Sequence, residues 1–491
     1  MFEGWVYHSA AQCGIRYRII TVAVESSNSK YLEGLPLMKR HIFRERLLIM
    51  GVFAYLFSWA AMNVFIVGGV EREELLIEGP GGKPCLGTLW LPNDPKAVII
   101  VGHGVTVNRG GMATVANAFA RNGYAALAID FRGHGRSRER FDWSSNAGQV
   151  NAWYDWAVER YPGLPLAYLG HSMGGAAGDA AFRDSPSVAA FVSMGMLPGR
   201  IPECRTLIAM GRFEELFTVE QARRVAQDKA DVLVSPFSDH TLEPADPVLI
   251  QGIITWVNSA LGIEREGVFP WGRWMLTLLA AIIGGAAALL AAEKAAAALR
   301  RFAASCCPTP ARPPGRFNLF RIAAWMIGCK GDSAPPRSGN LLFAVFRGLV
   351  FSLIFVVLMS WILTTNVYTC NLNHPERCIM WLVLGFIMTC LFFLTSRALE
   401  RIPLHGALQR FAVGALTRAT PLLLVCLALM LMGPGIAFAG MMSGILALVF
   451  VFIAAIYALA VRGAGDYRSG AVACGIVLAW ITAFWFPLIW G

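Results

Sequence analysis

The sequence predicts a doubly wound, mostly parallel α/β sheet joined to an all-α transmembrane domain. Short apolar runs alternate with helix-like segments over residues 75–262, which is typical of a sheet covered by helices on both faces. Longer apolar runs, sufficient to cross a bilayer core of about 30 Å, stand before and after this region. Only 15% of the 491 residues are charged, against about 25% in soluble domains. At about 150 residues per domain, the length allows two or three domains.

The distribution of charge indicates membrane topology and argues against a nucleic-acid partner. The net charge is +10, but residues 71–270 carry 18 Lys or Arg against 23 Asp or Glu. The basic surplus therefore lies in the other segments, beside the apolar runs, as expected for cytoplasmic loops. The mean hydropathy of +0.53 also fits a membrane protein.

The eleven cysteines show no C-x-x-C pair and no Cys/His spacing of a zinc site. The cysteines therefore give no sign of a zinc site. Most of the cysteines lie in apolar runs, where they serve as small packing residues. Cys370 and Cys378 flank a polar loop between two apolar runs, and they could be bridged if that loop faces an oxidising compartment.

The first part of the chain is expected to be a cytoplasmic segment followed by one transmembrane helix. Residues 1–46 carry no secretory pattern and end in a basic cluster. Residues 47–70 are uncharged and long enough to span a bilayer. Because Glu71, Glu73 and Glu74 follow directly, the amino terminus is predicted to stay in the cytoplasm and the next domain to be extracytoplasmic.

Residues 71–270 are expected to form the α/β domain. An opening hairpin is predicted from the apolar runs on either side of the turn residues 79–82. The later strands are predicted from short apolar runs, at 97–101, 124–129, 166–169, 188–194, 206–210 and 231–234. Helices are predicted between them, at 111–122, 149–160, 173–182, 219–228 and 247–261.

Residues 271–491 are expected to form a membrane domain of about six transmembrane helices, which makes seven spans in all. The expected spans are about 274–292, 341–363, 379–394, 422–438, 441–461 and 471–490. With this count every basic loop falls on the cytoplasmic side, including one that carries Arg410 and Arg418. Residues 317–327, in a Pro- and Arg-rich stretch, are expected to form a helix on the membrane surface. The spans hold almost no internal charge, which weighs against ion-coupled transport.

The stretch Gly170-His171-Ser172-Met173-Gly174 follows an apolar run and precedes a run of small residues. It fits the G-x-S-x-G nucleophile elbow, in which a serine lies on a sharp turn between a strand and a helix. Glycines are needed there because the residues two before and two after the serine crowd each other. The helix that follows directs its backbone N–H groups at the serine, where an oxyanion would develop. Ser172 is therefore the predicted nucleophile.

A serine nucleophile needs a base that takes its proton and an acid that orients the base. In a fold with this elbow, the acid follows a late strand and the histidine follows the acid. His240 is the only histidine after Ser172 within residues 71–270, so it is the predicted base. Glu214 and Glu215 both lie in the loop after a late strand. Glu214 is the predicted acid, and Glu215 is the alternative.

The oxyanion hole is predicted to use two backbone N–H groups, from Met173 and Val105. Val105 lies in the loop after the apolar run 97–101, which supplies the second donor in this kind of site. The neighbouring Gly104 lets the backbone approach a substrate closely. His103, in the same loop, is expected to brace the loop rather than to act as a base.

Two further groups of polar residues are expected to be structural. The run from Asp130 to Ser137 precedes the serine in sequence, so its acid and its histidine are interpreted as a charged turn that holds loops near the site. Asp239, beside His240, is expected to be a capping or turn residue.

Taken in order, these motifs resemble the α/β-hydrolase superfamily. They are His103-Gly104, Asp130-x-Arg132-Gly133-His134-Gly135-x-Ser137, Gly170-His171-Ser172-Met173-Gly174-Gly175 and His240. The chain is similar in particular to serine aminopeptidase-like hydrolases and to monoacylglycerol lipase or lysophospholipase relatives, over about residues 75–261. The resemblance implies hydrolysis of an ester, thioester or amide through an acyl-serine intermediate, without a cofactor. Two features depart from the family: the acid is Glu rather than the commoner Asp, and the cap is reduced to residues 197–205.

The sequence therefore predicts a membrane-bound serine hydrolase, an esterase or lipase, that acts on a small-molecule or lipid-derived acyl substrate at the membrane. The alternative is a transporter or receptor-like protein that uses the hydrolase-like domain as a binding module. The complete set of Ser172, His240 and Glu214 argues against that alternative. Transfer of the acyl group to an acceptor other than water stays open, because transfer and hydrolysis begin with the same acyl-serine. The oligomeric state also stays open.

Overall fold

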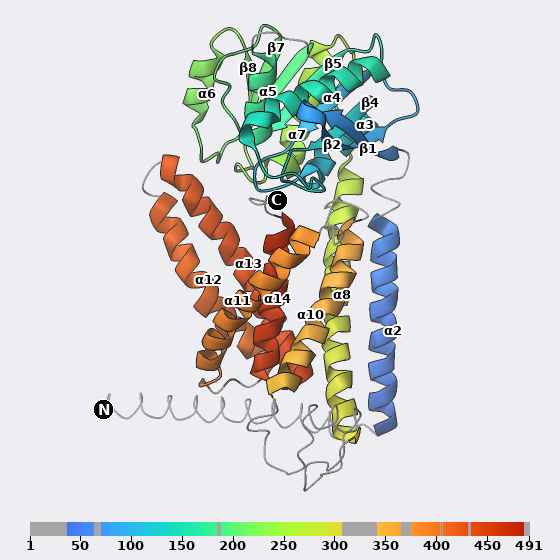
Figure 1. Ribbon diagram of the computed structural model, residues 1–491, viewed down its shortest axis with the longest axis vertical. Coiled ribbons are helices and arrows are strands. Elements are labelled where there is room, and N and C mark those ends of the chain that lie inside the picture. The colour runs from blue at the N-terminus through green and yellow to red at the C-terminus, as the bar shows by residue number, and fades with distance from the viewer. Residues whose placement is uncertain are drawn as a thin grey trace, which may run out of the picture. The chain divides into compact units, whose positions relative to one another are not determined.

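An eight-stranded sheet forms the centre of the domain between Glu71 and Ala260 (Figure 1). The computed structural model describes residues 37–62, 70–183, 188–306, 341–364, 375–402, 404, 406–430 and 434–485. The strand order is β1-β2-β4-β3-β5-β6-β7-β8. The strands are β1 (Glu71–Gly79), β2 (Lys83–Leu91), β3 (Ala97–Gly102), β4 (Tyr124–Asp130), β5 (Leu166–His171), β6 (Ala190–Met194), β7 (Arg205–Gly211) and β8 (Asp231–Ser235). β2 pairs antiparallel with β1 and β4, and the other pairings are parallel, which confirms the predicted mostly parallel sheet.

Helices cover both faces of this sheet. They are α3 (Ala113–Arg121), α4 (Asn146–Arg160), α5 (Met173–Phe182), α6 (Val219–Ala226) and α7 (Pro247–Ala260). On one face, Val98 and Ile100 of β3 share a buried cluster with Trp153 of α4. On the other face, Tyr124 of β4 donates its O–H to Asn258 Oδ1 of α7 at 2.6 Å. Strand β3 is buried along its whole length because helices lie on both sides of it.

The connection between β6 and β7 is short. The structure describes residues 195–204 throughout and assigns them neither a helix nor a strand. The backbone N–H of Gly199 donates to Asp179 of α5 at 3.0 Å, which ties this connection to the helix that follows the elbow. The prediction that the cap is reduced to a short link is therefore confirmed.

After the α/β domain, the described part of the chain forms six helices long and apolar enough to cross a membrane. They are α8 (Trp271–Cys306), α10 (Leu341–Thr364), α11 (Pro375–Leu399), α12 (Ala407–Met430), α13 (Pro434–Ala464) and α14 (Tyr467–Trp485). They are compatible with a multi-pass membrane protein. Helix α14 packs against α10, α11 and α13, and most of its apolar stretch is buried among them.

Three predictions fall partly or wholly outside the described residues. Helix α2 (Leu37–Met62) covers much of the expected span 47–70, and its apolar stretch Ile49–Ala61 is shorter than a full span. Residues 63–69 are not described. The surface helix at 317–327 and residue Cys370 also lie outside the described part, so that helix and the bridge to Cys378 stay predictions.

The helix bounds correct the expected spans in one region. The expected span 422–438 joins the end of α12, at Met430, to the start of α13, at Pro434. A helix begins at Pro434 because proline lacks a backbone N–H and suits the first turn. Arg410 and Arg418, expected in a loop, lie inside α12. The Arg418 guanidinium lies 5.2 Å from the ring centre of Phe392, where cation–π attraction favours it.

Candidate active site

Ser172 lies at the sharp turn between β5 and α5. Its backbone has φ 52° and ψ −115°, a conformation that a residue with a side chain rarely adopts. A Cβ atom on Gly170 would collide with the backbone of Gly174, and one on Gly174 would collide with the carbonyl of Gly102. The predicted crowding of these two positions is therefore confirmed for Gly170, whereas Gly174 is crowded by Gly102 of β3. The Ser172 N–H donates to Met194 O of β6 at 2.9 Å, which fixes the turn against the sheet.

A chain of hydrogen bonds joins the serine to a buried carboxylate. His240 Nε2 lies 3.0 Å from Ser172 Oγ, and His240 Nδ1 lies 2.9 Å from Glu214 Oε2. Because an ionised carboxylate only accepts hydrogen bonds, Nδ1 carries the proton and Nε2 accepts from the serine hydroxyl. The Glu214 side chain is fully buried and that of His240 nearly so. The structure thus brings together the three residues that the sequence singled out.

The two adjacent glutamates contact different parts of His240. Glu214 reaches the imidazole ring, whereas Glu215 Oε2 accepts the backbone N–H of His240 at 3.2 Å. Burial raises the pKa of Glu215 to about 7. The alternative acid of the sequence prediction therefore lies against the backbone of the loop and not against the ring.

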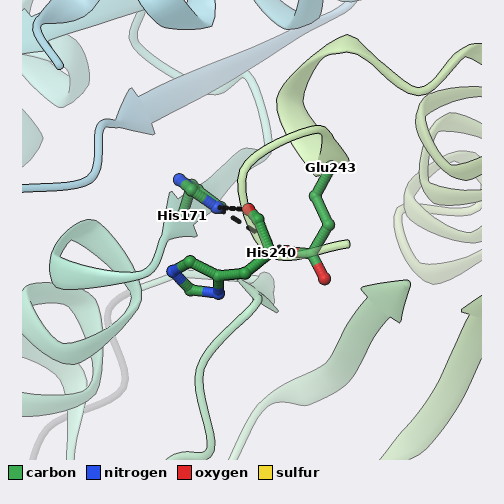
Figure 2. A group of neighbouring side chains, drawn as sticks. All are labelled: His171, His240 and Glu243. Atoms are coloured by element: carbon green, nitrogen blue, oxygen red, sulfur yellow. Dashed lines mark hydrogen bonds and ion pairs between the residues drawn. The ribbon is translucent and has the colours of Figure 1, made fainter. Parts of the chain in front are cut away.

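The loop that carries His240 is held in place by two further contacts. Asp239 Oδ1 accepts the backbone N–H groups of Thr241 and Leu242 at 3.0 and 2.9 Å, which confirms its predicted role as a turn residue. His171 Nε2 lies 2.9 Å from His240 O (Figure 2). Burial lowers the pKa of His171 to about 3, so its ring is neutral, and its Nε2–H donates to that carbonyl.

The predicted oxyanion donors lie on the two segments where they were expected. Met173 is the first residue of α5, and Val105 lies in the loop after β3. His103 Nε2 accepts the N–H of Phe131 at 3.1 Å, so its Nδ1–H donates to Gly104 O at 2.8 Å. His103 therefore braces this loop, as predicted. His134 Nε2 lies 2.8 Å from the Val105 carbonyl oxygen, and its Nδ1 lies 3.0 Å from the Arg132 carbonyl oxygen.

Asp130 forms the buried charged turn that the sequence predicts. Its carboxylate accepts from the backbone N–H and from Nη1 of Arg109, at 2.9 and 2.8 Å. It also accepts the backbone N–H of Arg136 at 3.0 Å. Arg109 is almost fully buried, and its Nη2 donates to Glu74 of β1 at 2.5 Å. Sequence reasoning missed Arg109 and Glu74 because nothing in their local pattern separates them from surface charges.

A second buried carboxyl group, that of Glu243, also escaped sequence reasoning. It follows His240 closely and lies in the short helix η5 (Glu243–Ala245) before α7. Its side chain lies beside His171 and His240 (Figure 2). These three residues are spaced as metal ligands can be, but both ring nitrogens of His240 already bond to Ser172 and Glu214. A metal there would have to break the Ser172–His240–Glu214 chain.

The α/β domain is similar in sequence to known proteins. The family model described as "Serine aminopeptidase, S33" matches residues 93–207. A monoacylglycerol lipase of Mycolicibacterium smegmatis is 35% identical over 109 residues, 21% of this chain and 39% of that protein. A human monoglyceride lipase is 38% identical over 92 residues, 18% of this chain and 30% of that protein. The chain thus spans well under half the length of these relatives.

Two solved structures are similar at lower identity. One is a cold-adapted esterase from an Arctic intertidal metagenomic library, with 18% identity, a TM-score of 0.34, and coverage of 40% of this chain and 95% of that one. The other is a dienelactone hydrolase from Anabaena variabilis, with 22% identity, a TM-score of 0.34, and coverage of 39% and 96%. The sheet topology, the elbow and the matched family together assign the domain between Glu71 and Ala260 to the α/β-hydrolase superfamily.

Proposed function

We propose that this protein is a membrane-bound serine hydrolase that cleaves an ester bond through an acyl-serine intermediate. The proposal rests above all on the continuous chain from Ser172 Oγ through His240 to Glu214. Ser172 is the nucleophile, His240 the general base and Glu214 the acid that orients it. The names of the relatives, a monoacylglycerol lipase and a monoglyceride lipase, favour a lipid-derived acyl ester as the substrate class.

The proposed reaction uses these contacts. Ser172 Oγ attacks the acyl carbonyl while its proton passes to His240 Nε2, and Glu214 stabilises the imidazolium that forms. The backbone N–H groups of Met173 and Val105 donate to the oxyanion of the tetrahedral intermediate. The intermediate collapses to the acyl-serine, and the alcohol leaves with the proton from His240. Water then gives a proton to His240 and attacks the acyl-serine, which releases the acid and restores Ser172.

We also propose that the hydrolase domain is extracytoplasmic and that the amino terminus is cytoplasmic. The basic cluster before residue 47 and the acidic residues from Glu71 support this orientation. The domain would then be joined at both ends to membrane-spanning segments. Such an anchored site, under a short link rather than an inserted cap, suits acyl substrates that reside in or near a bilayer.

Labelling of the full-length protein in membranes with a fluorophosphonate probe tests the nucleophile. The wild-type protein is expected to form a stable adduct, and Ser172→Ala is expected to form none, because the probe requires an activated serine hydroxyl. Ser144→Ala, on the surface before α4, is the matched control and is expected to label as wild type. Equal labelling of Ser172→Ala and wild type would refute the assignment.

A further inference from the structure

Glu243 is a fully buried carboxyl group directly behind the proposed triad. Its side chain has no exposed surface. Its Oε1 accepts the backbone N–H of Gly211, at the end of β7, at 2.7 Å. No N–H or hydroxyl group of the described residues donates to its Oε2. A group this deeply buried needs partners for both oxygens, or it must give up its charge.

The surroundings of Glu243 disfavour a second negative charge. Glu214 lies within hydrogen-bonding reach of it. His171 Nε2 is 3.6 Å from Glu243 Oε2, but the His171 ring is neutral and its N–H is already donated to a carbonyl. Burial, together with the charge of Glu214, raises the pKa of Glu243 well above its ordinary value. The titratable groups that face Glu243 among the described residues are Glu214, Glu215, His171 and His240.

The backbone at Gly195 leaves the space that the Glu243 carboxyl group occupies. Gly195, which follows β6, has φ +61°. A Cβ atom at this position would collide with Glu243 Oε2 and would lie 3.0 Å from His240 Nδ1. Glu243, Gly195 and the edge of the imidazole ring therefore pack together with no room for another side chain. Glu243 therefore packs near the Nδ1 side of the His240 ring, where Glu214 also lies.

We propose that Glu243 is a positioning residue of the triad: its carboxyl group stays neutral and donates its O–H to the Glu214 carboxylate. This inference rests on the proposed roles of Ser172, His240 and Glu214. One negative charge is then shared by two carboxyl groups, and Glu214 is held facing Nδ1. The donated hydrogen bond draws negative charge from Glu214, so that Glu214 orients the imidazolium without taking its proton.

Substitution of Glu243 by Gln and by Leu separates this role from simple packing. Glutamine keeps an acceptor for Gly211 N–H and a donor for Glu214, whereas leucine keeps neither. Full-length Glu243→Leu is expected to lose about 100-fold in kcat on a p-nitrophenyl ester, and Glu243→Gln to recover most of that loss. Glu159→Leu, an exposed position on α4, is the matched control and should stay close to wild type. Loss of activity in the glutamine variant equal to that in the leucine variant would overturn the proposal.

The pH profile distinguishes positioning from a purely structural effect. Without the donor, negative charge concentrates on Glu214 and stabilises the protonated ring of His240. The acid limb of kcat/KM is therefore expected to move to higher pH in Glu243→Leu and to return in Glu243→Gln. An acid limb at the same pH in all three proteins would contradict the shared hydrogen bond.

Thermal unfolding provides a readout that needs no catalytic activity. Folded wild-type protein retains the Glu243 proton above the ordinary Glu pKa of about 4.3, whereas the unfolded chain has lost it. Wild-type Tm should therefore fall relative to that of Glu243→Gln as the pH rises from about 5 to 8. A constant difference in Tm would show that Glu243 is ionised when folded and would overturn the proposal. Retained labelling of Ser172→Ala would instead refute the proposed function and leave this Tm result unaffected.

Discussion

The Oε2 atom of Glu214 lies 2.9 Å from Nδ1 of His240, on the side of the ring opposite Ser172. Glu214 Oε1 accepts the backbone N–H of Leu216 at 2.9 Å. Both oxygens of this buried carboxylate therefore have donors, and its orientation is fixed by the loop after β7. A carboxylate held this way sets the tautomer of the histidine, which a serine nucleophile requires.

Replacement of Glu214 is expected to be far more harmful than replacement of Glu215. In Glu214→Gln, the histidine loses its ionic partner and adopts the wrong tautomer, so kcat should fall by about 10³-fold to 10⁴-fold. Glu215→Gln removes only an acceptor for the His240 backbone N–H, and kcat should fall by less than about 10-fold. Ester hydrolysis by the two variants, prepared side by side in detergent, checks the ranking. A larger loss in the Glu215 variant would reverse the assignment of the acid.

His171 should make the domain sensitive to acid. Its pKa is lowered by burial to about 3, whereas in the unfolded chain it titrates near 6.5. Because the folded-state pKa is depressed for a base, the unfolded state binds more protons below about pH 6.5, and stability falls as the pH drops. Wild-type Tm is therefore expected to decrease more than that of His171→Gln between pH 7 and pH 5.5. Parallel changes in Tm would argue that His171 is charged when folded.

The pair of Arg109 and Asp130 should dominate the stability of the loops around the site. Asp130→Asn removes the charge that faces an almost fully buried guanidinium, and breaking such a pair costs about 3 kcal/mol. The matched control is Glu139→Gln, which removes a more exposed pair with Lys83 and should cost less than about 1 kcal/mol. Tm measurements on both variants test this difference. Equal effects would mean that Asp130 contributes no more than a surface charge.

The proposed orientation predicts which surfaces are accessible from outside the cell. A cysteine introduced at Glu159, an exposed position near the end of α4, is expected to react with a membrane-impermeant maleimide in intact cells. A cysteine at Arg468, near the start of α14, is the matched cytoplasmic position and should react only after permeabilisation, because basic connections stay inside. Labelling of both positions only in permeabilised cells would place the hydrolase domain in the cytoplasm and leave the triad untouched.

Features that depend on local pattern could be predicted from the residues alone. Short apolar runs predicted the strands, because a strand covered on both faces must be apolar throughout. Gly170 and Gly174 marked the elbow, because no other residue fits so close to a neighbouring backbone. The prediction of His240 as the base followed from its place in the chain after Ser172. The long apolar stretches likewise indicated the six long apolar helices, although one boundary was misjudged where Pro434 starts a new helix.

Which side chains meet could be seen only in the folded protein. Glu214 and Glu215 are neighbours in sequence, yet one faces the ring of His240 and the other its backbone, because the turn after β7 directs them differently. Glu243 has no local signal at all, since its burial results from β6, β7 and the His240 loop closing around it. Contacts between residues distant in the chain, and the desolvation that accompanies them, arise only when the sheet is assembled.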